Sequence, residues 1–155
     1  MALVLGSSFP NVEVNTTDGK FKLHDYQGDS WLVFFSHPAD YTPVCTTELG
    51  RAVKLVDEFT KRNVKLIALS CDSVADHKGW SGDVMAFCSK PGEKMPYPII
   101  EDESRQLANQ FGMLDPVAKD AAGMPLTCRA VFVVDPNKKM RLSILYPAST
   151  GRNFE

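Results

Sequence analysis

The segment Ser-His-Pro-Ala-Asp-Tyr-Thr-Pro-Val-Cys-Thr-Thr-Glu, residues 36–48, decides the fold of this chain. Thr42 is a good N-cap residue, and Pro43 then takes the first helical position, where its fixed φ and missing N–H cost nothing. This register places Cys45 in the first turn, where unpaired backbone N–H groups and the helix dipole favour an anion. The segment predicts a helix from Pro43 and a reactive thiolate. The alternative is a buried cysteine that packs as a small apolar side chain.

Apolar runs on either side of this segment predict a βαβ unit. Residues 31–35 are continuously apolar, as expected for a strand buried on both faces. Apolar residues then recur at helical spacing through residues 49–59, and residues 64–70 form the next strand. Strands joined in this way are parallel, and ligands bind outside their carboxyl ends. Cys45 is therefore expected near the ligand-binding edge of a sheet.

The remaining elements are predicted from local patterns. Ser73 caps a helix that Gly79 and Gly82 should make short or irregular. Its candidate core residues are Val74, Trp80, Val84 and Phe87. We also expect an N-terminal hairpin over 12–23, a loop or short helical turn ending at Gly28, a short strand at 99–100, a helix over 104–111, a loop over 115–125, and antiparallel strands at 129–134 and 139–146.

Bulk properties indicate a globular protein of one domain, residues 1–155. The hydrophobic fraction is 44%, the charged fraction is 23%, and the net charge of -2 does not suggest a nucleic-acid partner. The first five residues are too short for a signal segment, and no run is long enough to span a membrane. We therefore expect a cytoplasmic protein.

The four cysteines contain no Cys-x-x-Cys pair, which argues against a disulfide framework or a zinc site. Cys71 ends a strand and is expected in the core, whereas Cys88 is the candidate for exposure. Cys128 should point to the opposite face of its strand from Arg129. Arg129 opens an apolar strand, where an arginine is costly unless it is paired. It is either an edge or surface residue or the cation that a sulfur nucleophile requires.

The spacing Pro-x-x-x-Thr-x-x-Cys, filled by Pro38, Thr42 and Cys45, closely resembles the active-site signature of the peroxiredoxins. Further segments are similar to their 1-Cys, type-6-like branch, and the resemblance covers nearly the whole chain. It implies an α/β, thioredoxin-like fold with an N-terminal β-hairpin extension and a central mixed sheet flanked by helices. The branch carries a C-terminal domain, so this chain is expected to be C-terminally truncated, without the last helix of the core. The further matching segments are residues 63–70, 112–116, 145–148 and 150–154.

The resemblance implies a thiol peroxidase whose Cys45 thiolate attacks the peroxide O–O bond and becomes a sulfenic acid. Thr42 would hydrogen-bond the sulfur and the peroxide, and Pro38 would shield the sulfenic acid from water. Arg129 matches the active-site arginine that stabilises the developing charge.

Glu48, His37 and Arg152 match supporting polar positions of the same family. Simpler interpretations remain open, because Glu48 is also a first-turn acid favoured by the helix dipole and His37 could only fill a pocket. No resolving cysteine follows Cys128, so the reductant is expected to be an external thiol. Glutathione, delivered by a glutathione-transferase-like partner, is the expected source, with no other cofactor and no metal. A homodimer is expected, altered by the missing C-terminal domain.

Other functions fit the sequence less well. A thiol–disulfide oxidoreductase lacks its Cys-x-x-Cys motif, and a metal site of Cys71, His77 and Cys88 follows no zinc spacing. A redox sensor or chaperone-like protein remains conceivable if oxidation of Cys45 changes assembly. The phospholipase A2-like activity of the branch is not expected, because the Gly-x-Ser-x-Gly motif lacks its second glycine. The residues considered for that activity are Gly28, Ser30, His24, Asn137 and Asp135.

Overall fold

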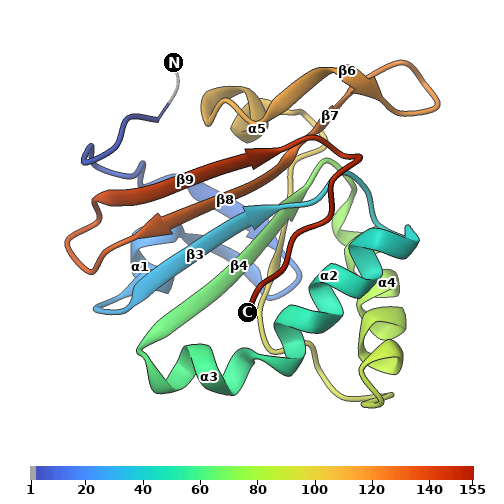
Figure 1. Ribbon diagram of the computed structural model, residues 1–155, viewed down its shortest axis with the longest axis horizontal. Coiled ribbons are helices and arrows are strands. Elements are labelled where there is room, and N and C mark those ends of the chain that lie inside the picture. The colour runs from blue at the N-terminus through green and yellow to red at the C-terminus, as the bar shows by residue number, and fades with distance from the viewer. Residues whose placement is uncertain (1–2) are drawn as a thin grey trace.

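The computed structural model describes residues 3–155, which fold around a central β-sheet (Figure 1). Met1 and Ala2, part of the apolar N-terminal run, lie outside the described residues. The strands are β1 (Glu13–Thr16), β2 (Gly19–Lys22), β3 (Trp31–Ser36), β4 (Val64–Ser70), β5 (Ile99–Glu101), β6 (Leu114–Lys119), β7 (Pro125–Thr127), β8 (Arg129–Val134) and β9 (Met140–Tyr146). The helices are α1 (Leu23–Gln27), α2 (Pro43–Lys54), α3 (Val56–Lys61), α4 (Val74–Phe87) and α5 (Gln106–Gln110).

The main sheet is mixed, with the strand order β2-β1-β5-β4-β3-β8-β9. Strand β3 pairs with β4 in parallel and with β8 in antiparallel orientation. The predicted βαβ unit, the N-terminal hairpin and the antiparallel β8–β9 pair are all confirmed. This topology brings the carboxyl ends of β3 and β4 and the start of β8 to one edge of the sheet.

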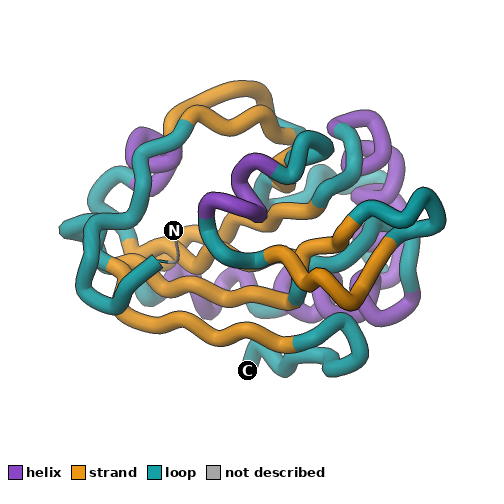
Figure 2. Tube along the Cα trace, turned by 90° about the horizontal axis from the view of Figure 1, so that it is seen from above, coloured by secondary structure: helices purple, strands orange, loops and turns teal. Residues whose placement is uncertain are grey.

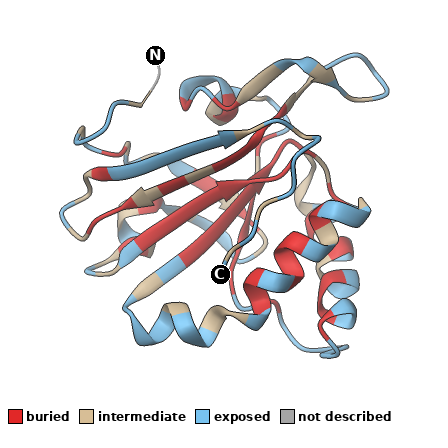
Figure 3. Cartoon of the chain, viewed as in Figure 1, coloured by how far each residue is buried: buried red, intermediate tan, exposed pale blue. Residues whose placement is uncertain are grey.

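Helices lie on both sides of the sheet (Figure 2), so the sheet separates two hydrophobic cores. Successive residues of a strand point to opposite faces. Phe34 therefore packs in the core beneath α1 and α5, whereas its neighbour Phe35 packs in the core beneath α2 and α4. Figure 3 shows that burial is concentrated on the central strands and on the sheet-facing side of α2. Within residues 3–155, no helix is both long and apolar enough to cross a bilayer.

The helix after the opening segment starts at Pro43, as predicted, but it does not run unbroken to Phe59. The helix is interrupted at Leu55, whose N–H donates to the carbonyls of both Arg51 and Ala52. That shared bond tightens the last turn of α2 and starts α3 as a separate helix. Phe59, on α3, is only partly buried.

Helix α4 contradicts the prediction of a short or irregular helix, because it runs regularly for 14 residues. Its Ser73 cap is confirmed, since Ser73 Oγ accepts the N–H of Asp76 at 3.0 Å. Buried Trp80 and Val84 hold the helix against the sheet, and this packing outweighs the low helix propensity of the two glycines. Two expected core residues are wrong: Phe87 is 48% exposed and Val74 is only partly buried. Their places are taken by His77 and Met85.

The predicted loop over 115–125 is also wrong, because most of it forms the β6–β7 hairpin. These strands are mostly half-buried or exposed, with Val117 at 88%, so the sequence lacks the apolar alternation that marks a strand. The helix predicted over 104–111 is shorter. It begins after Arg105, whose φ is 61°, and the chain turns at Gly112, whose φ is 68°.

We expect Gly82→Ala to stabilise the fold by about 1 kcal/mol, because alanine favours helix and nothing lies within 4 Å of the new Cβ. Gly50→Ala is the matched contrast on α2. Its Cβ would meet Phe87 Cδ1 at 2.6 Å and Cys88 Sγ at 3.1 Å, so overpacking should destabilise the fold by about 1–3 kcal/mol. Urea unfolding of both variants measures the difference. Equal stabilities would contradict this account of α4 and α2.

Candidate active site

The start of α2 places Cys45 in the first helical turn, as predicted. Thr42 is extended, with φ -109° and ψ 147°, and its carbonyl accepts the N–H of Thr46 at 2.9 Å. The side chain of Thr42 does not cap the helix but donates to the carbonyl of Ala39 at 2.9 Å. The N-cap position is therefore confirmed, while the Thr42 hydroxyl instead ties the preceding turn together.

Arg129 reaches Cys45 across 84 positions of sequence. Its Nη1 lies 3.3 Å from Cys45 Sγ and 2.5 Å from Glu48 Oε1. Its Nε and Nη2 donate to the carbonyl of Ala148 at 3.1 and 2.9 Å. Arg129 is 4% exposed, so the interpretation as a surface arginine is wrong. The guanidinium is buried, and its hydrogen bonds go to α2 and to the C-terminal segment.

Glu48 is the acceptor that holds two arginines in this buried site. Besides Arg129, it binds Arg152, whose backbone N–H and Nε lie 2.6 and 3.0 Å from Oε2. Burial acts to raise the pKa of Glu48, but the hydrogen bonds and charge of Arg152, with the charge of Arg129, outweigh it and lower that pKa. Two guanidiniums and one carboxylate leave one net positive charge. A thiolate at Cys45 would neutralise it.

The C-terminal segment after β9 completes the site by running back over the sheet beside α2 (Figure 1). Phe154 packs edge-on against Phe35 with ring centroids 5.1 Å apart. The Arg152 guanidinium lies beside both rings, 5.7 Å from the centroid of Phe35 and 5.3 Å from that of Phe154. Its Nη1 also donates to the carbonyl of Ala130 at 2.7 Å. Arg152 is thus a buried structural cation as well as a partner of Glu48.

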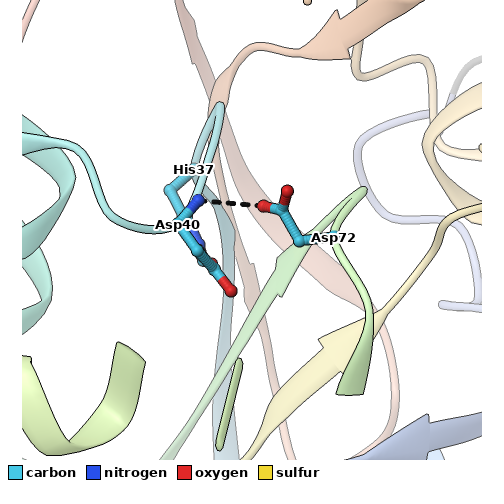
Figure 4. Close-up of side chains that lie close together, drawn as sticks. All are labelled: His37, Asp40 and Asp72. Carbon is cyan, nitrogen blue, oxygen red and sulfur yellow. Dashed lines mark hydrogen bonds and ion pairs between the residues drawn. The ribbon is translucent and has the colours of Figure 1, made fainter. Parts of the chain in front are cut away.

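His37 and Pro38 are both buried in the turn that precedes α2. His37 Nε2 lies 2.7 Å from Asp40 Oδ1, and the imidazole packs 4.9 Å from the indole of Trp80. Figure 4 shows Asp72, two residues after the end of β4, opposite His37 and Asp40. Ligating atoms of these three residues lie within 4.8 Å of one another. Hydrogen bonds account for this approach, since His37 Nε2 bonds Asp40 Oδ1 and Asp72 Oδ2 accepts the Asp40 N–H.

Sequence reasoning did not place Asp40, Asp72 or His77 in this cluster; His77 was considered only as a metal ligand with Cys71 and Cys88. Asp40 Oδ2 lies 2.5 Å from Nδ1 of His77, and both side chains are buried. A histidine at position 77 on the apolar face of α4 was the available signal, since it replaces a core residue. Asp40 gave no such signal, because an aspartate in a turn is ordinarily exposed.

The sulfur of Cys45 is less accessible than expected. Cys45 is 1% exposed, because α2, β3 and α4 enclose it in the core that also holds Trp80 and Phe35. A cleft of ≈ 400 Å³ lies beside the first turn and is lined by Thr42, Thr46 and Trp80, among others, but Cys45 does not line it. The burial predicted by the alternative interpretation is thus observed, although the sulfur faces Arg129 rather than only apolar side chains.

The other three cysteines are buried, and burial raises the pKa of each thiol. Cys88 was the candidate for exposure, but it is 6% exposed and its thiol donates to the carbonyl of Gly50 at 3.2 Å. Burial raises the pKa of Cys71 to about 11 and also raises those of Cys88 and Cys128. Cys71 and Cys128 lie in the core on the opposite side of the sheet from Cys45. These three thiols are unreactive core residues in this structure.

The groups considered for a lipase-like site bond elsewhere. Ser30 Oγ donates to Asn63 Oδ1 at 3.0 Å, and His24 Nε2 lies 2.7 Å from the carbonyl of Phe9. Asp135 Oδ2 pairs with Arg141 at 2.7 Å. The hydrogen bonds that would define a Ser-His-Asp arrangement are replaced by these contacts.

A thiol at a helix start, facing a buried guanidinium on a mixed sheet with helices on both faces, defines a class of proteins: the thiol-dependent peroxidases of thioredoxin-like fold. Comparison with known proteins narrows the class. The chain belongs to the AhpC/TSA family, whose model matches residues 5–143, and within it to the 1-Cys, peroxiredoxin-6 branch. It is accordingly a thiol-dependent peroxidase of the 1-Cys type.

The relatives agree in sequence and in structure. Human peroxiredoxin-6 is 63% identical over 154 residues, which are 99% of this chain and 69% of that protein. The C45S mutant of the peroxiredoxin 6 of Arenicola marina superposes with a TM-score of 0.95 at 60% identity, covering 99% of this chain and 69% of that one. A yeast mitochondrial 1-Cys peroxiredoxin, studied for thiol resolution via glutathione/thioredoxin systems, gives a TM-score of 0.88 at 46% identity over 97% and 71%.

Glu48→Gln should destabilise the fold by about 3 kcal/mol, because it leaves two buried guanidiniums without their anion. The folded-state pKa of Glu48 is lowered, so its contribution is present above the usual glutamate pKa of about 4.3 and is lost as the pH falls. The difference in free energy of unfolding between wild type and Glu48→Gln should therefore become smaller below about pH 4. Denaturant unfolding at several pH values measures it.

Glu58→Gln is the control for that experiment. Glu58 pairs with Lys61 and Arg62 on the exposed surface of α3, where such pairs contribute about 0–1 kcal/mol. A loss in Glu48→Gln no larger than in the control would contradict the buried charge bridge.

Proposed function

We propose that Cys45 is the sulfur that reduces peroxide in this enzyme. Its thiolate attacks one peroxide oxygen, so the S–O bond forms as the O–O bond breaks. The leaving oxygen takes a proton and departs as water or an alcohol, and Cys45 is left as a sulfenic acid. Hydrogen peroxide and organic or lipid hydroperoxides share the bond that is broken and are the proposed substrates.

One observation carries this proposal: Arg129 Nη1 lies 3.3 Å from the Cys45 sulfur in a site that excludes water. Two opposite unit charges about 4 Å apart attract by about 4 kcal/mol at an effective dielectric constant near 20. The same guanidinium can stabilise charge that develops on the leaving oxygen, which is where preorganised donors contribute most. An uncharged thiol would leave the net positive charge of the site unbalanced.

The surrounding residues have supporting roles in this proposal. The Thr42 hydroxyl donates to the sulfur or to the peroxide after its hydrogen bond to the carbonyl of Ala39 breaks. Pro38 excludes water from the sulfenic acid. Glu48 holds Arg129 in place, and Arg152 shares the carboxylate with it. His37 supports the turn before α2, as developed below.

One equivalent of hydrogen peroxide should add one oxygen to Cys45, and Cys45→Ser should consume none. Arg129→Met should slow oxidation about 10²-fold, the usual cost of losing one preorganised donor to developing charge. Arg129→Lys keeps the charge but loses the forked guanidinium that binds Glu48 and Ala148 together. Its oxidation rate should therefore lie between those of wild type and Arg129→Met. Stopped-flow oxidation and peptide mass mapping measure these effects. A wild-type rate in Arg129→Met would refute the assigned role.

The proposed reductant of the sulfenic acid is an external thiol, namely glutathione delivered by a glutathione-transferase-like partner. Support comes from the burial and raised pKa values of Cys71, Cys88 and Cys128, which make each a poor resolving thiol. The yeast relative is resolved via glutathione/thioredoxin systems. Residues 1–155 are proposed to act as one peroxidase domain in the cytoplasm.

Oxidised protein should gain the mass of one glutathione on Cys45 when glutathione is added, and thioredoxin should then be compared at equal concentration. The triple variant Cys71→Ala, Cys88→Ala, Cys128→Ala should form the same glutathione adduct on Cys45 as wild type, since no other thiol of the chain takes part. A Cys45–Cys88 disulfide as the main product of one peroxide equivalent would overturn the external-thiol proposal. Mass spectrometry under non-reducing conditions distinguishes the two.

A homodimer is also proposed. Strand β9 ends the sheet order, and Leu142, Ile144 and Leu145 on it are 38–53% exposed. An exposed apolar edge strand is a surface that pairs readily with another chain. A second copy of this chain is the proposed occupant.

A further inference from the structure

Asp40 lies between two buried imidazoles at the edge of the sheet that carries the active site. Its Oδ1 is 2.7 Å from His37 Nε2, and its Oδ2 is 2.5 Å from His77 Nδ1. Both histidines are fully buried, and Asp40 is 7% exposed. The cluster joins the turn after β3 to helix α4.

The hydrogen bonds of His77 require one more proton than its neutral form supplies. His77 Nε2 lies 2.9 Å from the carbonyl of Ile100, and because a carbonyl only accepts, Nε2 must carry hydrogen. In a neutral imidazole Nδ1 would then be bare and would face Asp40 Oδ2 at 2.5 Å without a hydrogen between them. One extra proton therefore lies between His77 Nδ1 and Asp40 Oδ2, whichever atom holds it.

His37 is held in the opposite way, as a neutral ring. Its Nε2 faces Asp40 Oδ1 and donates to it, while its Nδ1 is buried without a hydrogen-bond partner. Burial lowers the pKa of His37, although Asp40 acts to raise it. Burial alone would raise the pKa of Asp40, but hydrogen bonds from both imidazoles lower it to about 2. The cluster thus holds one shared proton and one fixed His37 tautomer.

The turn before α2 and one chain of side-chain contacts connect the cluster to Cys45. The Asp40 backbone N–H donates to Asp72 Oδ2 at 2.9 Å, which ties the turn before α2 to the end of β4 (Figure 4). The His37 ring packs on Trp80, whose Nε1 donates to Thr46 Oγ1 at 3.0 Å. Thr46 follows Cys45 in the first turn of α2. A change in the cluster would therefore shift the backbone that presents the sulfur.

We propose that Asp40 and His77 are positioning residues of the peroxidase site, which trap one proton, fix His37 in its Nε2–H tautomer and anchor residues 37–42 before α2. This inference rests on the proposed function of Cys45, because the anchored turn acts only through that sulfur. The titratable groups that face the cluster are His37, Asp40, His77 and, from the end of β4, Asp72.

Asp40→Asn separates the proton from the geometry. An asparagine oxygen can accept from His37 while its NH₂ donates to a bare Nδ1 of His77, so both hydrogen bonds persist with one proton fewer. The wild-type native state binds that proton, and its unfolded state releases it as the pH rises. The unfolding constant of wild type relative to Asp40→Asn should therefore increase about tenfold per pH unit from about pH 6 to pH 8. Asp57→Asn, on the exposed face of α3, should give a flat ratio.

The rates of Cys45 oxidation test the positioning role. Asp40→Ala, which cannot bridge the imidazoles, should slow oxidation by about tenfold or more, and Asp40→Asn should recover most of the wild-type rate. An Asp40→Ala rate equal to wild type would overturn the role. If Asp40→Ala does not fold, His77→Phe, which removes the bridged imidazole but keeps an apolar ring in the core, takes its place with the same expected loss.

Nitrogen-15 NMR of the wild-type imidazoles tests the proton directly, with His24 as the reference among the three histidines. His77 should carry hydrogen on both nitrogens, or share one with Asp40, and His37 should carry it only on Nε2. A His77 with one bare nitrogen that is not bridged, or a pH-independent unfolding ratio, would overturn the shared proton. If the NMR result is as expected but wild type does not oxidise at Cys45, the proposed function fails and the proton cluster stands.

Discussion

The fold depends on a buried carboxylate, that of Glu48, held between the guanidiniums of Arg129 and Arg152. Burying two like charges without an anion would be prohibitive, so the carboxylate is what permits both arginines to enter the core. Each guanidinium also binds a backbone carbonyl, of Ala148 and Ala130. The bridge thereby joins α2, β8 and the C-terminal segment, and its one unbalanced positive charge faces the Cys45 sulfur.

A second polar cluster supports the same helix from the other side. Asp40 bonds His37 and His77 much as Glu48 bonds its two arginines. In this cluster the charge of the carboxylate is balanced by the proton shared with His77. The charged bridge faces the sulfur directly, whereas the histidine cluster acts on the turn that precedes it. Together they fix both ends of the short segment from His37 to Glu48. The hydrogen-bonded neighbours of the Cys45 thiol fix its position, and the same burial restricts the access of solvent to the sulfur.

The places where sequence reasoning failed share a cause. The regularity of α4 depends on Trp80 and Val84 packing into the core, which outweighs two glycines. The strands of the β6–β7 hairpin are mostly half-buried or exposed, and no apolar alternation in the sequence marks them. The burial of Cys45 and Cys88 depends on side chains from α2, α4 and the sheet, which no local pattern specifies. Local rules describe one element at a time, and these features arise between elements.

The sequence by itself determined the start of α2 at Pro43, the strands on either side of it and the placement of Cys45 in the first turn. These follow from capping chemistry, the fixed φ of proline and the period of apolar residues, all of which act over a few positions. Only the tertiary structure decided that Arg129, 84 positions from Cys45, and Arg152, 104 positions from Glu48, meet on one helix. Charges separated so far along the chain find each other through sheet order and burial, which no local stretch of sequence contains.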